Sequence, residues 1–270
     1  MNKSQIRELL GNLKAAARLG HPAAVEIALD DLRAVPIIAA NDHLSEGHLD
    51  QLVYPVGDIL ARLPASHLRQ LLEDQFTALR AVAGVALAKR FLTGKEANQK
   101  MLFVLAKDTR PEVRTALGET LRKVGEAHPE HLLHLVESWL RDSSPKVRAT
   151  ALVALPAMVS SQGEDVIKLL EPLKADEDRD VRAAMVKALQ AIAQKDVADL
   201  VLTLLTDWST AKYPNTWVIT RTLSGSWAVS HPLDVETILS NLHAKFGKTK
   251  NITNALRALE RHGLLIKIES

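Results

Sequence analysis

The chain contains no cysteine, and only 4% of its 270 residues are aromatic. The absence of cysteine excludes disulfides, thiolate metal sites and a cysteine nucleophile, and it fits a reducing cytoplasm. Hydrophobic residues still make up 47% of the chain, so the apolar content is mostly alanine, leucine and valine, a composition that favours helices. The formal net charge is only +2, so any affinity for nucleic acid must come from a local basic patch.

Long hydrophobic runs are also missing. One of the longer uncharged runs, AVAGVALA at 81–88, ends at Lys89 and is far too short to span a membrane. The first residues, MNKSQIRELLGNLKAAARLG, are interrupted by charges and lack the continuous apolar core of a signal peptide. We therefore expect a cytoplasmic protein without a membrane partner.

The sequence does contain a repeat. The segments 108–114 (DTRPEVR), 142–148 and 176–182 (DEDRDVR) each begin with aspartate, end in Val-Arg and are 34 residues apart, and one step back gives DQFTALR (74–80). Self-similarity at such a period predicts a solenoid. The period places four aspartates and four arginines in register: Asp74, Asp108, Asp142 and Asp176, and Arg80, Arg114, Arg148 and Arg182.

Each of these segments leads into a predicted helix. Small or apolar residues recur three, four, eight and eleven positions after Val113, Val147 and Val181, which is the spacing of one helix face. Proline suits the first helical position and Ser or Asp suits the N-cap, which are the predicted places of Pro111, Pro145, Ser144 and Asp178. Further helical segments at 96–107, 129–141, 164–174 and 196–207 complete antiparallel pairs, which must stack to bury their apolar faces.

These residues resemble the HEAT repeat, which has an aspartate in the turn within the repeat and a Val-Arg pair opening its second helix. The match is specific over residues 74–192 and looser elsewhere. The resemblance implies an all-α fold, a right-handed α-solenoid of about six to seven helix pairs. It also implies that the eight aligned aspartates and arginines pair between neighbouring repeats as a ladder, which is a structural role; contact of one of the four arginines with a ligand is the lesser alternative.

The regularity fails at both ends. Residues 1–64 read as degenerate N-terminal repeats or a cap, with helices predicted over 6–20, 23–41 and 49–63, the last interrupted by Pro55. Regular 34-residue repeats follow over 65–207, and residues 208–270 form irregular C-terminal repeats or a cap. Because no Gly/Ser-rich or Pro-rich linker divides the chain, we predict a single domain over 1–270.

The irregular C-terminal segment WSTAKYPNTWVITRTLSGSWAVSHP (208–232) is rich in aromatic residues. Two interpretations stay open: the aromatics cap the open core of the last repeat, or they bind a partner or stack on a base. The basic residues that follow in the chain extend the candidate surface, although such residues more often form a solvated charged face with no ligand. The candidate binding residues are Trp208, Tyr213, Trp217, Arg221, Trp227, Lys245, Lys248, Lys250, Arg257 and Arg261.

The second helix of each pair is expected to line the concave side of the stack. The positions predicted there are mostly small and apolar, which suits either an apolar helix or peptide or a tight curvature that buries them; DNA is less suited, since a groove that follows DNA should be basic. They are Ala81, Gly84, Val85, Ala88, Thr115, Gly118, Glu119, Arg122, Ala149, Leu152, Val153, Pro156, Ala183, Val186 and Lys187.

No catalytic constellation is apparent. His131 and His134 share a helix face close to His128, but a metal would need a further ligand from elsewhere, so we predict no metal site and no cofactor. Phosphate-binding loops, dinucleotide fingerprints and nucleophile elbows are absent from the sequence. Acidic residues abound, so an aspartate acting as a general base stays open.

One stretch, VITRTLSGSWAVSHPLDVETIL (218–239), is similar in pattern to the C-terminal repeat of the AlkD-type DNA alkylation-repair glycosylases. This resemblance implies a stacking role for Trp217 or Trp227 and a phosphate contact for Arg221. It does not place the catalytic aspartate, because Asp142, near Trp139, belongs to the predicted ladder.

Two functional hypotheses follow. The first is a non-enzymatic interaction scaffold that binds a protein partner on its concave or C-terminal surface. The alternative is a DNA-binding repair protein resembling the alkylbase glycosylases. The sequence does not decide whether the chain has catalytic activity.

Overall fold

The computed structural model describes residues 3–39, 43–93 and 96–268, and all regular structure in these ranges is helical. The prediction of an all-α solenoid is confirmed. Contacts divide the chain into two compact units, residues 1–127 and 128–270, which we describe separately. Among the described residues, no helix combines the length and apolarity needed to cross a membrane.

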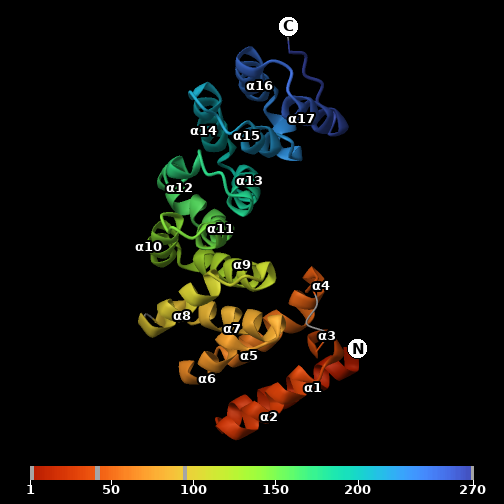
Figure 1. Cartoon of the computed structure of the whole chain (residues 1–270), viewed down its shortest axis with the longest axis vertical. Coiled ribbons are helices and arrows are strands. Elements are labelled where there is room, and N and C mark those ends of the chain that lie inside the picture. The colour runs from red at the N-terminus through yellow and green to blue at the C-terminus, as the bar shows by residue number, and fades with distance from the viewer. Residues whose placement is uncertain (1–2, 40–42, 94–95, 269–270) are drawn as a thin grey trace. The chain divides into compact units, whose positions relative to one another are not determined.

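The first unit carries its long helices side by side. Helix α7 (Thr77–Lys89) packs between α5 (Tyr54–Leu60) and α9 (Pro111–Ala127), and all of its residues from Thr77 to Ala88 except Arg80 are buried. The remaining elements are α1 (Lys3–Leu19), α2 (Pro22–Arg33), α3 (Pro36–Ala39), α4 (Glu46–His48), η1 (Leu49–Val53), α6 (Ala65–Arg69), η2 (Gln70–Glu73), η3 (Phe91–Thr93) and α8 (Glu96–Ala106) (Figure 1).

Proline positions explain two departures from the predicted N-terminal helices. The helix predicted over 23–41 ends at Arg33, and Pro36 begins the short α3; residues 40 and 41 lie outside the described part. In the segment 49–63, a π-helical turn, η1, precedes α5, and Pro55 lies in the first turn of α5. Because η1 runs into α5 without a break, the wider π-helical turn just before Pro55 accommodates a residue that cannot donate a backbone hydrogen bond.

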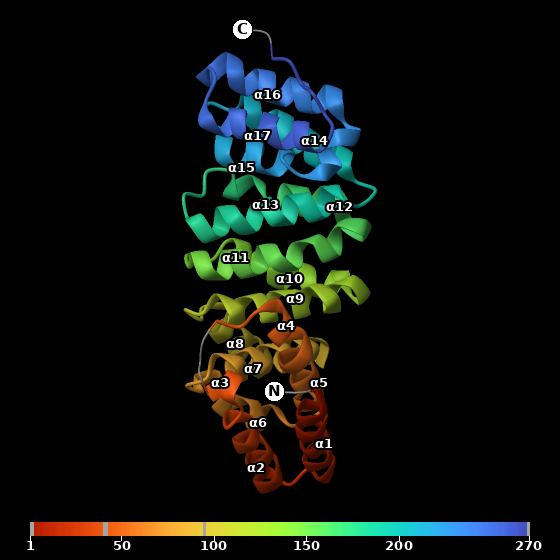
Figure 2. The same ribbon diagram turned by 90° about the vertical axis from the view of Figure 1, so that its right-hand side faces the viewer.

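The second unit has two layers of helices (Figures 1 and 2). One layer consists of α11 (Pro145–Ala154), α13 (Arg179–Ala193), α15 (Thr216–Leu223) and α17 (Lys250–Arg261), each packed on the next. The other consists of α10 (Pro129–Leu140), α12 (Val159–Lys168), α14 (Ala198–Thr210) and α16 (Pro232–Phe246). Short 3-10 turns join them: η4 (Leu155–Met158), η5 (Glu171–Leu173) and η6 (Ser226–Ser230).

The starts of the repeat helices largely follow the sequence signals. Pro111 and Pro145 begin α9 and α11, and the Asp178 carboxylate caps α13 by accepting from the Asp180 and Val181 amides. Ser144 is the N-cap residue of α11, but its side chain makes no capping hydrogen bond. The segment predicted as one helix over 164–174 is instead the end of α12 followed by η5.

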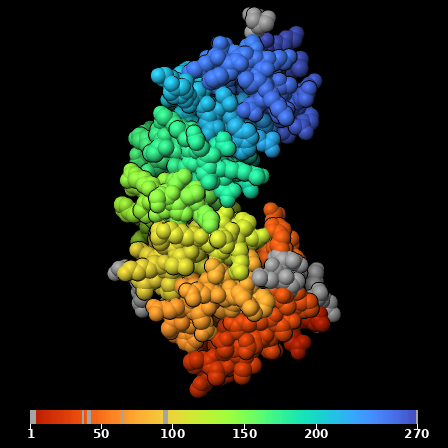
Figure 3. All heavy atoms as spheres, in the orientation of Figure 1, coloured from red at the N-terminus to blue at the C-terminus, as the bar shows by residue number. Residues whose placement is uncertain are grey.

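The side chains of successive repeats close over one another within residues 128–270 (Figure 3). Leucine, valine and alanine fill this core, and three of the four tryptophans, Trp139, Trp208 and Trp227, are buried in it. Removal of this apolar surface from water is the main stabilising term, because neither helix of a pair can bury its apolar side alone.

Candidate partner-binding surface

Arginine and aspartate pairs join neighbouring repeats, and we call each pair a rung. Arg80 Nε lies 2.6 Å from Asp108 Oδ2, and Arg148 Nε lies 2.8 Å from Asp176 Oδ2. The aspartate side chains are 0% and 7% exposed. The Oδ1 atom of each aspartate also accepts a hydrogen bond from the backbone N–H two residues later in the chain, which fixes the turn.

Another rung lies outside the 34-residue register. Arg33 donates from Nε and Nη2 to Asp74 Oδ2, at 3.2 and 2.9 Å. Burial lowers the pKa of Arg33, but hydrogen bonds to Glu26, Asp74 and Asp30 outweigh it and raise the pKa overall. Sequence reasoning missed Arg33 because it lies 41 residues before its aspartate, where the period no longer holds.

The ladder arginines also bind the turn of their own repeat. Arg114 Nη1 donates to the carbonyls of Asp108 and Thr109, at 2.8 and 3.2 Å. Arg148 Nη1 donates to the carbonyls of Asp142 and Ser143, at 2.9 and 3.0 Å. These hydrogen bonds hold each arginine against the turn of its own repeat, so its Nη1 atom is not available to a ligand.

The next repeat contains one extra residue, and this changes the ladder positions. The Ala211 amide donates to the Trp208 carbonyl at 3.2 Å, as the Asp142 amide donates to the Trp139 carbonyl at 3.2 Å. Ala211 therefore stands where the earlier repeats have aspartate. Trp217 lies six residues further on, but α15 begins only at Thr216, so Trp217 is the second residue of its helix, whereas Arg148 and Arg182 are the fourth residue of theirs. Counting exactly 34 residues from Asp176 and Arg182 leads to Thr210 and Thr216 instead. Pro214 lies one residue beyond the strict spacing from Pro111 and Pro145, and it is the sequence signal of the extra residue.

Arg182 is the last arginine of the series and has no rung. Its Nε is buried without a hydrogen-bond partner, and no ion pair of its guanidinium occurs within the described residues. The guanidinium carbon lies 5.8 Å from the centroid of the half-buried Trp217 ring. A cation beside an aromatic face is a favourable contact that partly replaces the lost carboxylate.

The structure separates the four C-terminal aromatic candidates. Trp208 and Trp227 are 2% and 8% exposed, and their indole N–H groups donate to Glu171 Oε1 at 2.9 Å and to the Thr222 carbonyl at 3.2 Å. Both belong to the core and offer no surface to a ligand. Tyr213 is exposed, and Trp217 is half-buried.

A row of cations crosses the solvent face of α13, α15 and α17, and we call Lys187, Arg221 and Arg257 the basic row. All three side chains are exposed; Lys187 and Arg257 lie within α13 and α17, and Arg221 lies in the last turn of α15. Contacts between the helices set the register. The Gln190 amide donates to the Arg221 carbonyl at 3.0 Å.

The register also holds at the starts of these helices. Arg182 faces Trp217, and Asn251 Nδ2 donates to Thr216 Oγ1 at 3.3 Å. The remaining basic candidates, Lys245, Lys248, Lys250 and Arg261, are exposed as well, and Lys245 also donates to the Ala211 carbonyl.

Most positions of the predicted apolar lining are buried, which agrees with the burial alternative and contradicts an exposed apolar groove for a partner. The small and apolar residues lie in the core because the second helices touch each other along that side: Ala81, Gly84, Val85, Ala88, Gly118, Ala149, Leu152, Pro156 and Val186 are buried. Partial or full exposure remains at Thr115, Glu119, Arg122, Val153, Ala183 and Lys187. The solvent face of these helices is therefore more polar than the sequence suggested.

One side-chain group among the described residues could hold a metal ion. Ligand atoms of His128, Glu130 and His131 lie within 4.8 Å of one another at the start of α10, and all three residues are exposed. His131 Nδ1 lies 2.7 Å from Glu130 Oε1. The backbone N–H of Glu130 and the neighbouring His131 lower the pKa of this carboxyl. His134, one of the three histidines considered from sequence, is not in the group.

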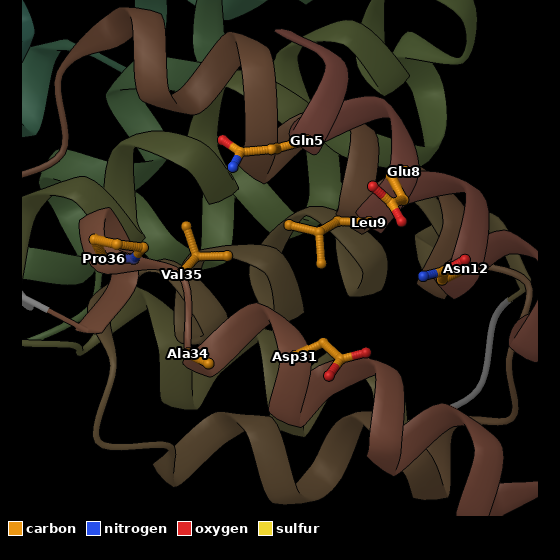
Figure 4. Close-up of a pocket in the computed structure, with 8 residues that line it drawn as sticks. All are labelled: Gln5, Glu8, Leu9, Asn12, Asp31, Ala34, Val35 and Pro36. Atoms are coloured by element: carbon orange, nitrogen blue, oxygen red, sulfur yellow. The ribbon is translucent and has the colours of Figure 1, made fainter. Parts of the chain in front are cut away.

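A hollow of about 850 Å³ lies in the first unit between α1 and the end of α2 (Figure 4). Its residues are mixed, with the apolar Leu9 and Val35 beside the polar Glu8, Asn12 and Asp31. None of the described residues that line it is a serine, threonine, histidine or lysine.

Comparison with known families agrees with this geometry. A family model described as HEAT repeats matches residues 65–156 and 132–212, which is more than half of the chain. No curated protein sequence matches the chain. The chain belongs to the HEAT-repeat family.

Proposed function

We propose that the chain is a non-enzymatic scaffold that binds a segment of a protein partner on the solvent face of α13, α15 and α17. The observation that carries the proposal is the basic row, three exposed cations in register on parallel helices. The segment 208–268 contains eight lysines and arginines against three acidic residues, so its surface favours an acidic partner.

The spacing of the basic row favours an extended partner segment. Packed helices lie about 8–10 Å apart, so the three cations recur at about that interval across the layer. A polyproline II segment rises about 3.1 Å per residue and has three residues per turn, which is about 9 Å. An acidic side chain at every third position of such a segment matches the row.

Photo-crosslinking tests this proposal. A benzophenone amino acid at position 221, on the basic row, is compared with one at position 160, an exposed serine on α12 in the other layer. We expect the probe at 221 to capture a discrete protein in the native host, and the probe at 160 to capture none in common. Equal capture at both positions, or no capture at 221, would contradict the proposal.

DNA binding is the second candidate, and the excess of basic residues in 208–268 is what favours it. Two observations place it second. Trp208 and Trp227 are buried and cannot stack on bases. Residues 129–207 carry thirteen acidic against nine basic residues, so a duplex lying along the whole layer would meet repulsion.

Duplex titrations at several salt concentrations distinguish the two functions. A DNA-binding protein would bind tightly, with an affinity that falls steeply as salt rises, because phosphate contacts release counterions. We expect weak binding to labelled duplex even at low salt.

A further inference from the structure

The end of the ladder carries an unmatched arginine. In the paired rungs, the arginine atom that binds aspartate is Nε, at 3.2 Å for Arg33, 2.6 Å for Arg80 and 2.8 Å for Arg148. At Arg182 this same atom is buried and has no partner among the described residues. We call Arg182, Ala211 and Trp217 the open rung.

The open rung lacks one component, a carboxylate. Ala211 occupies the aspartate position, and its methyl side chain cannot accept a hydrogen bond. Trp217 contacts the guanidinium only through its ring. A buried donor of a charged group is costly to leave unpaired, and the cation–π contact offsets only part of that cost. Arg182 and Trp217 both keep partial exposure, so an outside group can reach their outer atoms, whereas Nε itself is covered until a side chain moves.

We propose that Arg182 and Trp217 form a receptor for one aspartate or glutamate side chain of the partner segment. The incoming carboxylate takes the position that Asp108 and Asp176 occupy in the closed rungs, and the Trp217 ring shifts to admit it. Lys187 lies further along the same helix, so the acidic residues that follow in the segment reach the basic row. This inference rests on the proposed scaffold function and names the partner's chemistry.

Peptide binding by fluorescence anisotropy tests the receptor. The probes are fluorescein-labelled peptides of four Glu-Pro-Pro repeats and four Gln-Pro-Pro repeats, which share one extended conformation and differ in charge. We expect binding of the Glu peptide alone. Arg182→Gln should weaken it by about tenfold or more, the loss expected for one charge-assisted hydrogen bond.

A second pair of variants keeps the test independent of Arg182 itself. Ala211→Asp supplies the missing carboxylate from within the chain, so it should also weaken the Glu peptide. Thr210→Asp adds the same charge one residue earlier, on an exposed site that faces no rung, and should keep the wild-type affinity within a factor of about two.

Intrinsic fluorescence gives an independent readout. Trp139, Trp208 and Trp227 are buried, so acrylamide should quench mainly Trp217. We expect the Glu peptide to change this quenching in the wild type and in Thr210→Asp, but not in Ala211→Asp.

Four outcomes would contradict the inference or the scaffold proposal on which it rests. Unchanged Glu-peptide affinity in both Arg182→Gln and Ala211→Asp would exclude the open rung as the receptor, and the scaffold would then stand on the crosslinking at position 221. No binding of the Glu peptide by the wild type would exclude carboxylate recognition. Binding of a labelled single-stranded oligonucleotide that depends on Arg182 would make the ligand a phosphate. Loss of crosslinking at 221 would end the scaffold proposal itself.

Discussion

The ladder repeats (residues 74–192) and the C-terminal repeats (208–268) use the same helix pairs but place their charges differently. In the ladder repeats, Arg80 and Arg148 lie between helices, bound to aspartates that are almost fully buried. In the C-terminal repeats Ala211 takes the aspartate position, the Trp217 ring rather than a carboxylate contacts Arg182, and the cations lie on the solvent face. Charge at a joint stabilises the stack, whereas the same charge outside the joint is available to a partner.

The C-terminal joints use other polar contacts in place of arginine–aspartate pairs. Gln190 and Asn251 donate across successive helices at 3.0 and 3.3 Å, and the indole N–H of Trp208 donates to the Glu171 carboxylate at 2.9 Å. Apolar burial stabilises both regions, so the comparison concerns what is added to it at the joints. It predicts that loss of a buried tryptophan is costly in the C-terminal repeats and that a rung broken from one side is costly in the ladder repeats.

The largest effect is expected at Trp208, in the core of the C-terminal repeats. Trp208→Ala should lower the free energy of unfolding by about 3–5 kcal/mol, because it removes a large buried side chain and leaves a cavity. Urea unfolding followed by circular dichroism measures this. Trp217→Ala is the matched control, and its loss should be clearly smaller because Trp217 is half-exposed. Equal losses would mean that burial does not separate the two tryptophans.

A ladder rung should come next. Asp108→Ala leaves Arg80 partly buried without its carboxylate and also removes the acceptor for the Arg110 amide. Breaking a buried pair from one side typically costs about 3 kcal/mol or somewhat more. Asp199→Ala removes an exposed aspartate on α14 and should change the free energy of unfolding by less than about 0.5 kcal/mol. A small effect of Asp108→Ala would show that the ladder does not stabilise the stack.

Much of this architecture was predictable because it depends on local residue order. The period of 34 and the Val-Arg pairs mark the second helices, and Pro111 and Pro145 mark the residues at which α9 and α11 begin. The segment 164–174 carries none of these signals and is not a single helix. Asp178 could be predicted as a cap because capping needs only residues two and three positions away.

The features that escaped prediction depend on contacts between repeats. Exact steps of 34 pass over the single extra residue before Ala211, and only the Trp208 hydrogen bond identifies which residue replaces aspartate. Arg33 joins the ladder from outside the period. Composition could not separate buried from exposed tryptophans, because both occur at helical spacing in the same segment.

Closing the open rung should stabilise the C-terminal repeats. Ala211→Asp places a carboxylate in the position that pairs with arginine elsewhere, and we expect a gain of about 1 kcal/mol in the free energy of unfolding. The urea midpoint measures the gain at low and high salt. Thr210→Asp, with the same added charge, should give no gain. A destabilised Ala211→Asp would mean that Trp217 has displaced Arg182 too far for a rung to form.

The smallest change in the free energy of unfolding is expected for Arg221→Gln, a variant that should weaken binding of the Glu peptide. Arg221→Gln removes an exposed cation whose residue contributes only its backbone carbonyl to the joint, so unfolding should change by less than about 0.5 kcal/mol. Arg148→Gln removes the same side-chain type from a rung and should cost several times more. The affinity for the Glu peptide should show the reverse order. Arg221→Gln should weaken binding, whereas the folded fraction of Arg148→Gln should bind the peptide as the wild type does. Parallel losses of stability and binding in the two variants would contradict the division between charges that hold repeats together and charges that recruit a partner.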